Sequence, residues 1–372
     1  MVWLEEGEKP LNREPPIDKL VSSFITKEDA YDRNHGGIPH IDVAEHIVHV
    51  DGSVQNELQL SINNLRNDFE QHEVVCVLQC AGNRRHVMRT LLNEVQGIDW
   101  GEGAVMNCKW RGPRLRDVIA KAGVQIKDPT TAHVALACTT QKCQEDDWYG
   151  GSIKLDRALD READVILALE MNGEQLPVKH GYPVRAVVPA VAGARSVKWL
   201  DHITVQQEES SNFYQQHDYK VLPPEAKDSE SAKPYWDKVP ALQEMPINSV
   251  VAVPQTGETV MLNDDGTLTV KGYALPSGEN GPIAKVEVSI DDEKTWVEAE
   301  LINSSENGVS SKWSWTLWKC NLTTTPGDGK RILSRAIDSK GDTQATHPQW
   351  NLRGVAYNGY GEVRDITVIG RG

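Results

Sequence analysis

The chain has 372 residues, 39% hydrophobic and 25% charged, which is enough for two globular domains and is typical of a soluble protein rather than a disordered one. Its formal net charge of -15 opposes binding to nucleic acid or to an anionic membrane, and no apolar run approaches the roughly 20 residues that a membrane-spanning helix needs. An anionic substrate would therefore need a local cluster of arginine side chains.

Six cysteines lie mostly in apolar, strand-like runs and include no CxxC pair. They are Cys76, Cys80, Cys108, Cys138, Cys143 and Cys320. We interpret them as reduced thiols rather than as a disulfide framework or a zinc site. Any one of them can still serve as a metal ligand.

Neither end of the given sequence shows a recognisable targeting signal. The N-terminal residues are acidic and contain prolines, and they lack the apolar core of a secretory signal and the arginine-rich composition of a transit peptide. The last residues differ from the peroxisomal Ser-Lys-Leu ending. A cytoplasmic location is therefore expected, and the sequence leaves peroxisomal or mitochondrial import open.

Residues 1–22 predict an irregular arm because their prolines disfavour helix. The tetrapeptide at 26–29, Thr-Lys-Glu-Asp, has the pattern of a helix N-terminus, so a helix is expected there. The next segment, RNHGGIP at 33–39, predicts a loop because of its Gly-Gly pair and its proline. Its His-Gly-Gly lacks the proline of the HPGG haem loop, and the chain has no CxxCH site, so no haem is expected.

Residues 74–85, VVCVLQCAGNRR, predict a buried strand stopped by Ala-Gly-Asn. Cys80 stands at the end of this strand, and two arginines follow within one short turn. A thiol beside guanidinium groups suits chemistry on an anion. Taken alone, the pattern fits a small buried cysteine and surface arginines at least as well.

The middle of the chain contains clear local signals. Proline at 113, apolar residues at helical spacing and Gly123 predict a helix, and HVALAC at 133–138 predicts a strand. Residues 165–178 predict two strands joined by a type I′ turn at Asn172-Gly173.

The composition changes after residue 207. Residues 208–245 are polar and contain a Pro-Pro pair, which predicts an interdomain linker. Residues 246–370 alternate apolar and polar residues between turns, which predicts an all-β sandwich of immunoglobulin-like type. Trp313 and Trp315 in that region are expected in the core.

Several motifs, in chain order, resemble those of the sulfite oxidase family of molybdopterin enzymes. They are RNHGGIP at 33–39, LQCAGNRR at 78–85, WYGGSI at 148–153, EMNGEQLPVKHGYPVRAVVPAVAGARSVKWL at 170–200 and WNLRGV at 350–355. The resemblance spans roughly residues 20–357 and implies an α+β fold. A mixed α/β molybdopterin-binding catalytic domain (23–207) would follow the arm (1–22), and an immunoglobulin-like dimerisation domain (246–370) would follow the linker.

This resemblance implies that Cys80 binds molybdenum together with the dithiolene sulfurs of molybdopterin. It also implies that the pterin and its phosphate are held by Arg33, Asn34, His35, His180, Arg185, Ser196, Val197 and Lys198. A phosphate-terminated cofactor needs fixed cations and backbone N–H donors, which these residues can supply. Gly37 stands where the family usually has proline, and Thr-Thr-Gln at 139–141 replaces a pterin-contacting aspartate of many relatives.

The resemblance further implies oxidation of sulfite to sulfate, with two electrons passed to oxygen or to an external cytochrome. Arg33, Arg85 and Arg353 would bind the sulfite anion. Tyr149 would supply a phenol and Trp100 would line the pocket, although a structural tyrosine and a core tryptophan would look the same in sequence.

Nitrate reduction, or another oxo transfer on the same cofactor, is the alternative reaction. Nitrate reductases of this fold usually carry methionine at the position of Arg353 and asparagine near that of Tyr149, so both residues favour sulfite. A non-enzymatic interaction protein is a second alternative, which the retained Cys80 and Arg85 disfavour. A homodimer through the β domain is expected, and no motif marks the electron acceptor.

Overall fold

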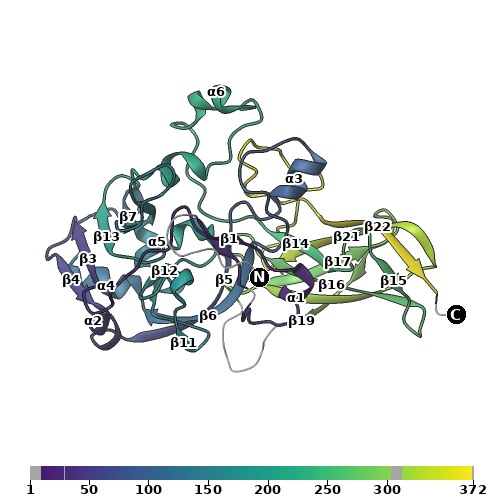
Figure 1. The fold of residues 1–372 in the computed structure, drawn as a ribbon, viewed down its shortest axis with the longest axis horizontal. Coiled ribbons are helices and arrows are strands. Elements are labelled where there is room, and N and C mark those ends of the chain that lie inside the picture. Colours follow the sequence, from purple (N-terminus) through teal and green to yellow (C-terminus); the bar gives the residue numbers. More distant parts are fainter. Residues whose placement is uncertain (1–9, 29, 303–311, 371–372) are drawn as a thin grey trace.

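The structure, a computed structural model, describes residues 10–28, 30–302 and 312–370. An N-terminal domain with mixed strands and short helices lies at one end, and a β-sandwich lies at the other (Figure 1). Among the described residues, no helix has both the length and the hydrophobicity needed to cross a membrane.

The first sheet of the N-terminal domain has five strands in the order β4-β3-β13-β7-β8. Their bounds are Leu58–Ser61, Ile47–Gly52, His202–Gln206, His133–Cys138 and Tyr149–Lys154. The β3 and β13 strands are parallel, whereas the other neighbours are antiparallel. Helices α4 (Leu115–Ala122) and α5 (Leu155–Leu159) pack into the same hydrophobic core. The predicted helix is confirmed, and it ends at Gly123 in the left-handed conformation.

The second sheet has the order β11-β10-β6-β5 and contains the predicted cysteine strand. Its strands are Glu174–Gln175, Glu170–Met171, Val105–Pro113 and Gln71–Gln79, and β9 (Ile166–Ala168) pairs separately with β12 (Arg185–Val187). Asn172 and Gly173 have φ angles of 57° and 84°, which confirms the type I′ turn. The remaining short helices are α1 (Ile17–Leu20), α2 (Ile62–Asn67), α3 (Arg85–Leu91), η1 (Pro129–Thr131), η2 (Arg161–Ala163), η3 (Val178–His180) and η4 (Gly193–Arg195).

The helix expected at Thr26 is wrong. The Thr26 backbone N–H donates to the carbonyl of Asn107 on β6 (2.8 Å), and the Thr26 hydroxyl accepts from the Asn107 N–H (3.0 Å). These bonds hold Thr26 along β6, so tertiary pairing overrides the local capping pattern. In the arm, β1 (Asn12–Arg13) pairs with β2 (Asp32–Arg33), next to the RNH loop, whereas residues 1–9 lie outside the described residues.

The C-terminal domain is the expected sandwich. One sheet has the order β14-β16-β20-β19, and the other has the order β15-β22-β21-β17-β18. In chain order the strands are Asn248–Val253, Thr259–Met261, Thr267–Leu275, Ile283–Ser289, Val297–Glu298, Glu300–Ile302, Thr316–Thr323, Gly327–Asp338 and Gly361–Ile369. Side chains of both sheets share one core, whereas the buried Trp313 and Trp315 pack with residues of the N-terminal domain.

The segment at 208–245, predicted to be a linker, contains short helices and is bonded to the N-terminal domain. It contains a π-helix, η5 (Tyr214–Asp218), and two short helices, α6 (Ser229–Ala232) and η6 (Lys233–Tyr235). Arg195 is fully buried and donates to the carbonyl oxygens of Tyr214 (3.0 Å) and Leu242 (3.1 and 3.2 Å). These bonds hold both ends of the segment against the N-terminal domain.

Candidate active site

A cavity in the N-terminal domain brings together most of the residues that the sequence singled out. Its walls are formed by Tyr31, Arg33, Asn34, His35, Cys80, Ala81, Met106, Gln141, Tyr149, His180, Arg185, Gly193, Ala194, Ser196, Lys198, Trp199 and Tyr219. Val197, Arg85, Trp100 and Arg353 do not line this cavity. Val197 is buried behind it, where its carbonyl accepts from Ala186 (2.8 Å) and fixes β12.

Cys80 lies where β5 ends and the following turn begins. Its backbone N–H donates to Ala104 (2.9 Å), and its carbonyl accepts from Asn83 (2.9 Å). The thiol is buried, free of any disulfide, and close enough to act electrostatically on Arg33, Arg85 and Tyr219. The cavity therefore has a thiol at its wall beside cationic groups, a soft ligand of the kind that suits a transition metal.

The RNH loop is held by the N-terminal arm, a support that the sequence did not indicate. The Asn12 carboxamide oxygen accepts from the Asn34 N–H (3.2 Å) and from the Arg33 guanidinium (3.3 Å). The Asn34 amide donates to the Leu11 carbonyl (3.1 Å). Short strand pairing between β1 and β2 thus presents Arg33 to the cavity.

His35 links Arg33 to Tyr219. Burial and the nearby Arg33 and Lys198 cations hold the pKa of His35 well below its usual value, so the ring is neutral. A guanidinium can only donate, so His35 Nδ1 accepts from Arg33 (3.0 Å). The ring proton is then assigned to Nε2, which donates to the Tyr219 oxygen (2.6 Å). This leaves the Tyr219 O–H free to donate to another group.

Basic side chains cluster in the part of the wall next to the RNH loop, where His180 and Arg185 are buried. Lys198 Nζ donates to the carbonyls of Arg33 (3.1 Å) and Lys179 (3.2 Å) and to the Asn34 side chain. Burial and the cations of Arg185 and Arg33 depress the pKa of Lys198 well below its usual value. Burial lowers the pKa of Arg185 to about 10, and burial with Lys198 lowers that of His180 as well.

The charge around this wall is only partly compensated. Asp32 is buried and lies 3.1 Å from Arg13, 3.3 Å from Lys179 and 3.7 Å from His180. The guanidinium of Arg185 donates instead to the neutral carbonyls of His180 and Ser196 (3.0 Å each). An anionic group in the cavity would raise the depressed pKa values again, so these residues fit a phosphate-bearing cofactor.

Arg85 and Arg353 lie next to one another outside the cavity walls. Arg85 donates to the carbonyls of Arg353 (3.0 Å) and Ile98 (2.8 Å). A Cβ atom at position 82, 97 or 354 would lie less than 3 Å from the Arg85 side chain, so these three glycines leave room for it in its present position. Arg353 is paired with Asp218 and has a buried Nε without a hydrogen-bond partner among the described residues.

Trp100 is buried in the same apolar cluster as Cys80 and Tyr31. Its indole N–H has no hydrogen-bond partner among the residues that the structure describes. Trp100 is therefore a core residue with one unpaired N–H donor. It does not line the cavity, in contrast to the role that the resemblance implies.

Tyr219 is the main site residue that the sequence missed. It lies in the polar segment at 208–245, directly after the π-helix, a geometry that concentrates at functional sites. Tyr149 does line the cavity, but its hydroxyl donates to the Ala194 carbonyl (2.9 Å). Gln141 was also missed as a wall residue, and its amide donates to the Gly37 carbonyl (2.8 Å).

Two family models match the chain. Residues 35–214 match the oxidoreductase molybdopterin binding domain, and residues 239–367 match the Mo-co oxidoreductase dimerisation domain. The first match contains Cys80 and all the cavity walls except Tyr31, Arg33, Asn34 and Tyr219, and the second contains Arg353.

Individual proteins are similar over most of the chain. Human mitochondrial sulfite oxidase is 40% identical over 362 residues, which cover 96% of this chain and 64% of the human protein. The chain thus spans just under two thirds of that relative. Sulfite oxidase from Arabidopsis thaliana is 38% identical, with coverage of 94% of this chain and 90% of the plant protein. The sulfane dehydrogenase SoxCD of Paracoccus pantotrophus shares the fold, with a TM-score of 0.78 at 23% identity over 99% of this chain and 90% of that one.

Proposed function

Because the chain belongs to the sulfite oxidase family of molybdopterin enzymes, we propose that it oxidises sulfite to sulfate with molybdenum bound to molybdopterin. The two electrons pass to an external acceptor, either oxygen or a cytochrome. The observation that carries the proposal is the Cys80 thiol in one cavity with Arg33, Arg185 and Lys198. A soft thiolate suits molybdenum, and the cations suit an anionic cofactor and an anionic substrate.

Two groups of residues divide the work. The cofactor side consists of His180, Arg185, Ser196 and Lys198, which would hold the pterin and its phosphate, with Asn34, His35 and Val197 in support. The substrate side consists of Arg85, Asp218, Tyr219 and Arg353. Arg33 lies between the two, and Cys80 would hold the metal. When bound, the metal centre supplies oxygen-atom transfer and takes up two electrons.

The arginines select an anion. Each charge-assisted hydrogen bond to sulfite contributes about 1.5–3 kcal/mol when it is shielded from water. Arg33 faces the cavity, whereas Arg353 is held by Asp218 and by the Gln96 amide oxygen (3.3 Å). Sulfite therefore competes with Asp218 for Arg353, so the carboxylate neutralises this cation until the substrate arrives.

We assign to Tyr219 the phenol role that the family resemblance implies for Tyr149. Its oxygen already accepts from His35, so its O–H can donate to an oxygen of sulfite or sulfate. Burial raises the pKa of Tyr219 above its usual value, so it stays a donor at neutral pH. Tyr149 packs against the His35 ring at 5.4 Å and keeps that ring in place.

Pairing through the C-terminal domain is also proposed. The family model that covers residues 239–367 is described as a dimerisation domain, which supports a homodimer. Sedimentation of the purified chain at micromolar concentration measures this directly, and a monomer under those conditions would contradict it.

The visible spectrum of the molybdenum-loaded protein, recorded without oxygen, tests the reaction. Addition of sulfite should bleach the thiolate-to-metal charge-transfer band, and return of the band in air would identify oxygen as the acceptor. Bleaching without recovery in air would keep sulfite oxidation and indicate a cytochrome. No bleaching in protein shown to contain the metal would overturn the proposal. Reoxidation of chemically reduced protein by nitrate would then favour nitrate reduction.

A further inference from the structure

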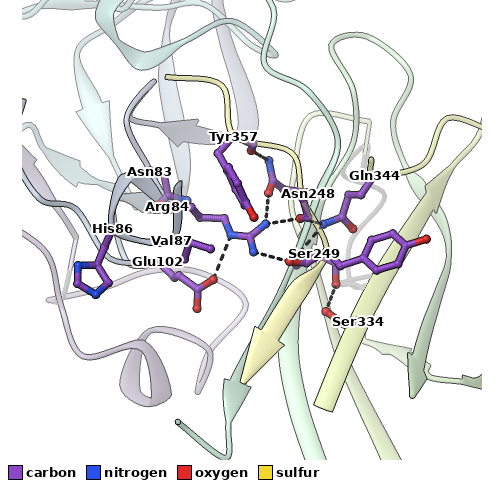
Figure 2. Close-up of polar contacts among 12 residues, drawn as sticks. Asn83, Arg84, His86, Val87, Glu102, Asn248, Ser249, Ser334, Gln344 and Tyr357 are labelled. Carbon is purple, nitrogen blue, oxygen red and sulfur yellow. Dashed lines mark hydrogen bonds and ion pairs between the residues drawn. The ribbon is translucent and has the colours of Figure 1, made fainter. Parts of the chain in front are cut away.

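Arg84 is fully buried where the two domains meet (Figure 2). Its guanidinium lies between Glu102 of the N-terminal domain and residues of the C-terminal domain, and it lies over the Tyr357 ring at 4.8 Å. Its hydrogen bonds go to Glu102 Oε1 (3.0 Å), Asn248 Oδ1 (2.8 Å) and the carbonyl oxygens of Gly359 and Tyr360 (2.7 Å each). Three of these four acceptors belong to the C-terminal domain.

The backbone turns sharply at this residue. Arg84 has a φ angle of 69°, in the left-handed region, and its N–H donates to the Gly101 carbonyl (2.7 Å). The two neighbouring arginines therefore reach different points of one stretch of the C-terminal domain, residues 350–360, which we call the return segment. Arg84 binds its end at 359–360, whereas Arg85 binds the carbonyl of Arg353.

The return segment carries Arg353, so its position decides where that cation lies. Other bonds tie it to the N-terminal domain, from the Ala356 N–H to the Ala81 carbonyl and from the Gln96 N–H to the Leu352 carbonyl (2.8 Å each). Among these links, two come from buried guanidinium groups, Arg85 at the Arg353 carbonyl and Arg84 at residues 359–360. The C-terminal domain cannot shift without leaving guanidinium N–H groups unpaired in the interior.

We propose that Arg84 is a positioning residue for substrate binding, which sets the separation between Arg85 and Arg353. The two cations come from different domains and must converge on one small anion, so a fixed interface raises their joint affinity. This inference rests on the proposed function, because it assigns Arg84 a part in sulfite binding. Arg84 itself does not line the cavity and acts only through its neighbours.

The Arg84→Lys variant tests the proposal, because lysine keeps the charge and loses the planar fork that reaches several acceptors at once. We expect the sulfite KM to rise about 10-fold with kcat within about 2-fold, as loss of uniform binding predicts. The matched control is Ser334→Ala, which removes the buried bond between the Ser334 and Ser249 hydroxyls (2.8 Å; Figure 2) without touching Arg84. The control should lower the melting temperature and leave the KM unchanged.

A double variant separates positioning from general weakening. If Arg84 acts through Arg353, Arg84→Lys should raise the KM little in an Arg353→Met background. An unchanged KM in the single variant, a full additive rise in the double variant, or an equal rise in Ser334→Ala would each overturn the inference.

Hydrogen exchange gives a readout that does not depend on turnover. The amides of residues 354–356 are hydrogen-bonded, and they should exchange faster in Arg84→Lys but not in Ser334→Ala. Unchanged exchange in folded Arg84→Lys would overturn the positioning role of Arg84 even if the enzyme oxidises sulfite.

If the wild-type protein fails to oxidise sulfite, the proposed function fails, and the exchange data still decide whether Arg84 holds the return segment. Should Arg84→Lys not fold, Asn248→Ala removes one acceptor of Arg84 and can replace it in all three tests, which are the sulfite KM, the double variant with Arg353→Met and hydrogen exchange.

Discussion

The cofactor side and the substrate side of the proposed active site are assembled from different amounts of the chain. His180, Arg185, Ser196 and Lys198 all lie within 19 consecutive residues of one domain. The substrate side takes Arg85 from the start of α3, Asp218 and Tyr219 from the π-helical segment and Arg353 from the return segment of the C-terminal domain. One side is preformed by local folding, whereas the other exists only when the two domains are correctly docked.

This difference has an energetic consequence. The cofactor side concentrates basic side chains with depressed pKa values, so an anionic cofactor contributes binding energy and relieves repulsion at the same time. On the substrate side, Arg353 already has a carboxylate partner in Asp218. The binding free energy that sulfite gains from Arg353 is therefore only the difference between its own interaction with that cation and the interaction of Asp218. Cofactor binding should therefore be tight, and substrate binding should be reversible and easily tuned.

The largest effect is expected for Cys80→Ser, which removes the residue that joins the two sides. Turnover should fall by more than about 100-fold, because loss of partners that only orient metal ligands already costs about 10- to 100-fold. The variant should fold normally, since serine is similar in size. Sulfite oxidation at the wild-type rate would remove Cys80 from the metal site.

Lys198→Met should act on the cofactor side alone. Loss of one charge-assisted bond predicts about 10- to 100-fold weaker cofactor binding, seen as a lower molybdenum content of purified protein by elemental analysis. The fraction that retains the metal should keep a sulfite KM near that of the wild type. Full metal content in Lys198→Met would remove this residue from the cofactor side.

Tyr219→Phe should act on the substrate side with a moderate effect. The lost O–H donor predicts a kcat/KM about 10- to 100-fold lower, with normal molybdenum content. Tyr149→Phe is the matched control, because the Tyr149 hydroxyl donates to a backbone carbonyl and should cost only about 1 kcal/mol of stability. If Tyr149→Phe lost more activity than Tyr219→Phe, the assignment of the phenol role would be reversed.

A smaller effect is expected in the pH dependence of stability. The pKa values of His35 and His180 are depressed in the folded chain, so below about pH 6.5 the unfolded chain binds protons that the folded chain does not. The free energy of unfolding should fall as pH drops, by up to about 1.4 kcal/mol per pH unit for each histidine. Urea titrations at several pH values measure this slope, and His35→Asn should reduce it. An unaltered slope in that variant would show that His35 is not held neutral.

The sequence was sufficient for the elements that depend on local patterns. The strand before Cys80, the helix ending at Gly123, the type I′ hairpin at Asn172-Gly173 and the C-terminal sandwich all follow from residue spacing and turn chemistry, and all are present. The Thr26 helix failed because β6 offers that backbone stronger partners than a new helix would.

The sequence could not locate the residues whose roles depend on contacts between distant segments. Tyr219 lies in a polar stretch without periodicity, and only the folded π-helix and the bond to His35 reveal it. Asn12 supports Arg33 through a two-residue strand, and Arg84 looks the same in sequence as its neighbour Arg85. A linear pattern does not specify which of two adjacent arginines reaches the other domain.

The most direct test of the two-sided active site is the sulfite KM of Arg353→Met, measured together with its molybdenum content. We expect the KM to rise about 10- to 150-fold, from the loss of one charge-assisted contact, while the metal content stays at the wild-type level. A variant that loses molybdenum in parallel, or that keeps the wild-type KM, would contradict the division between cofactor side and substrate side.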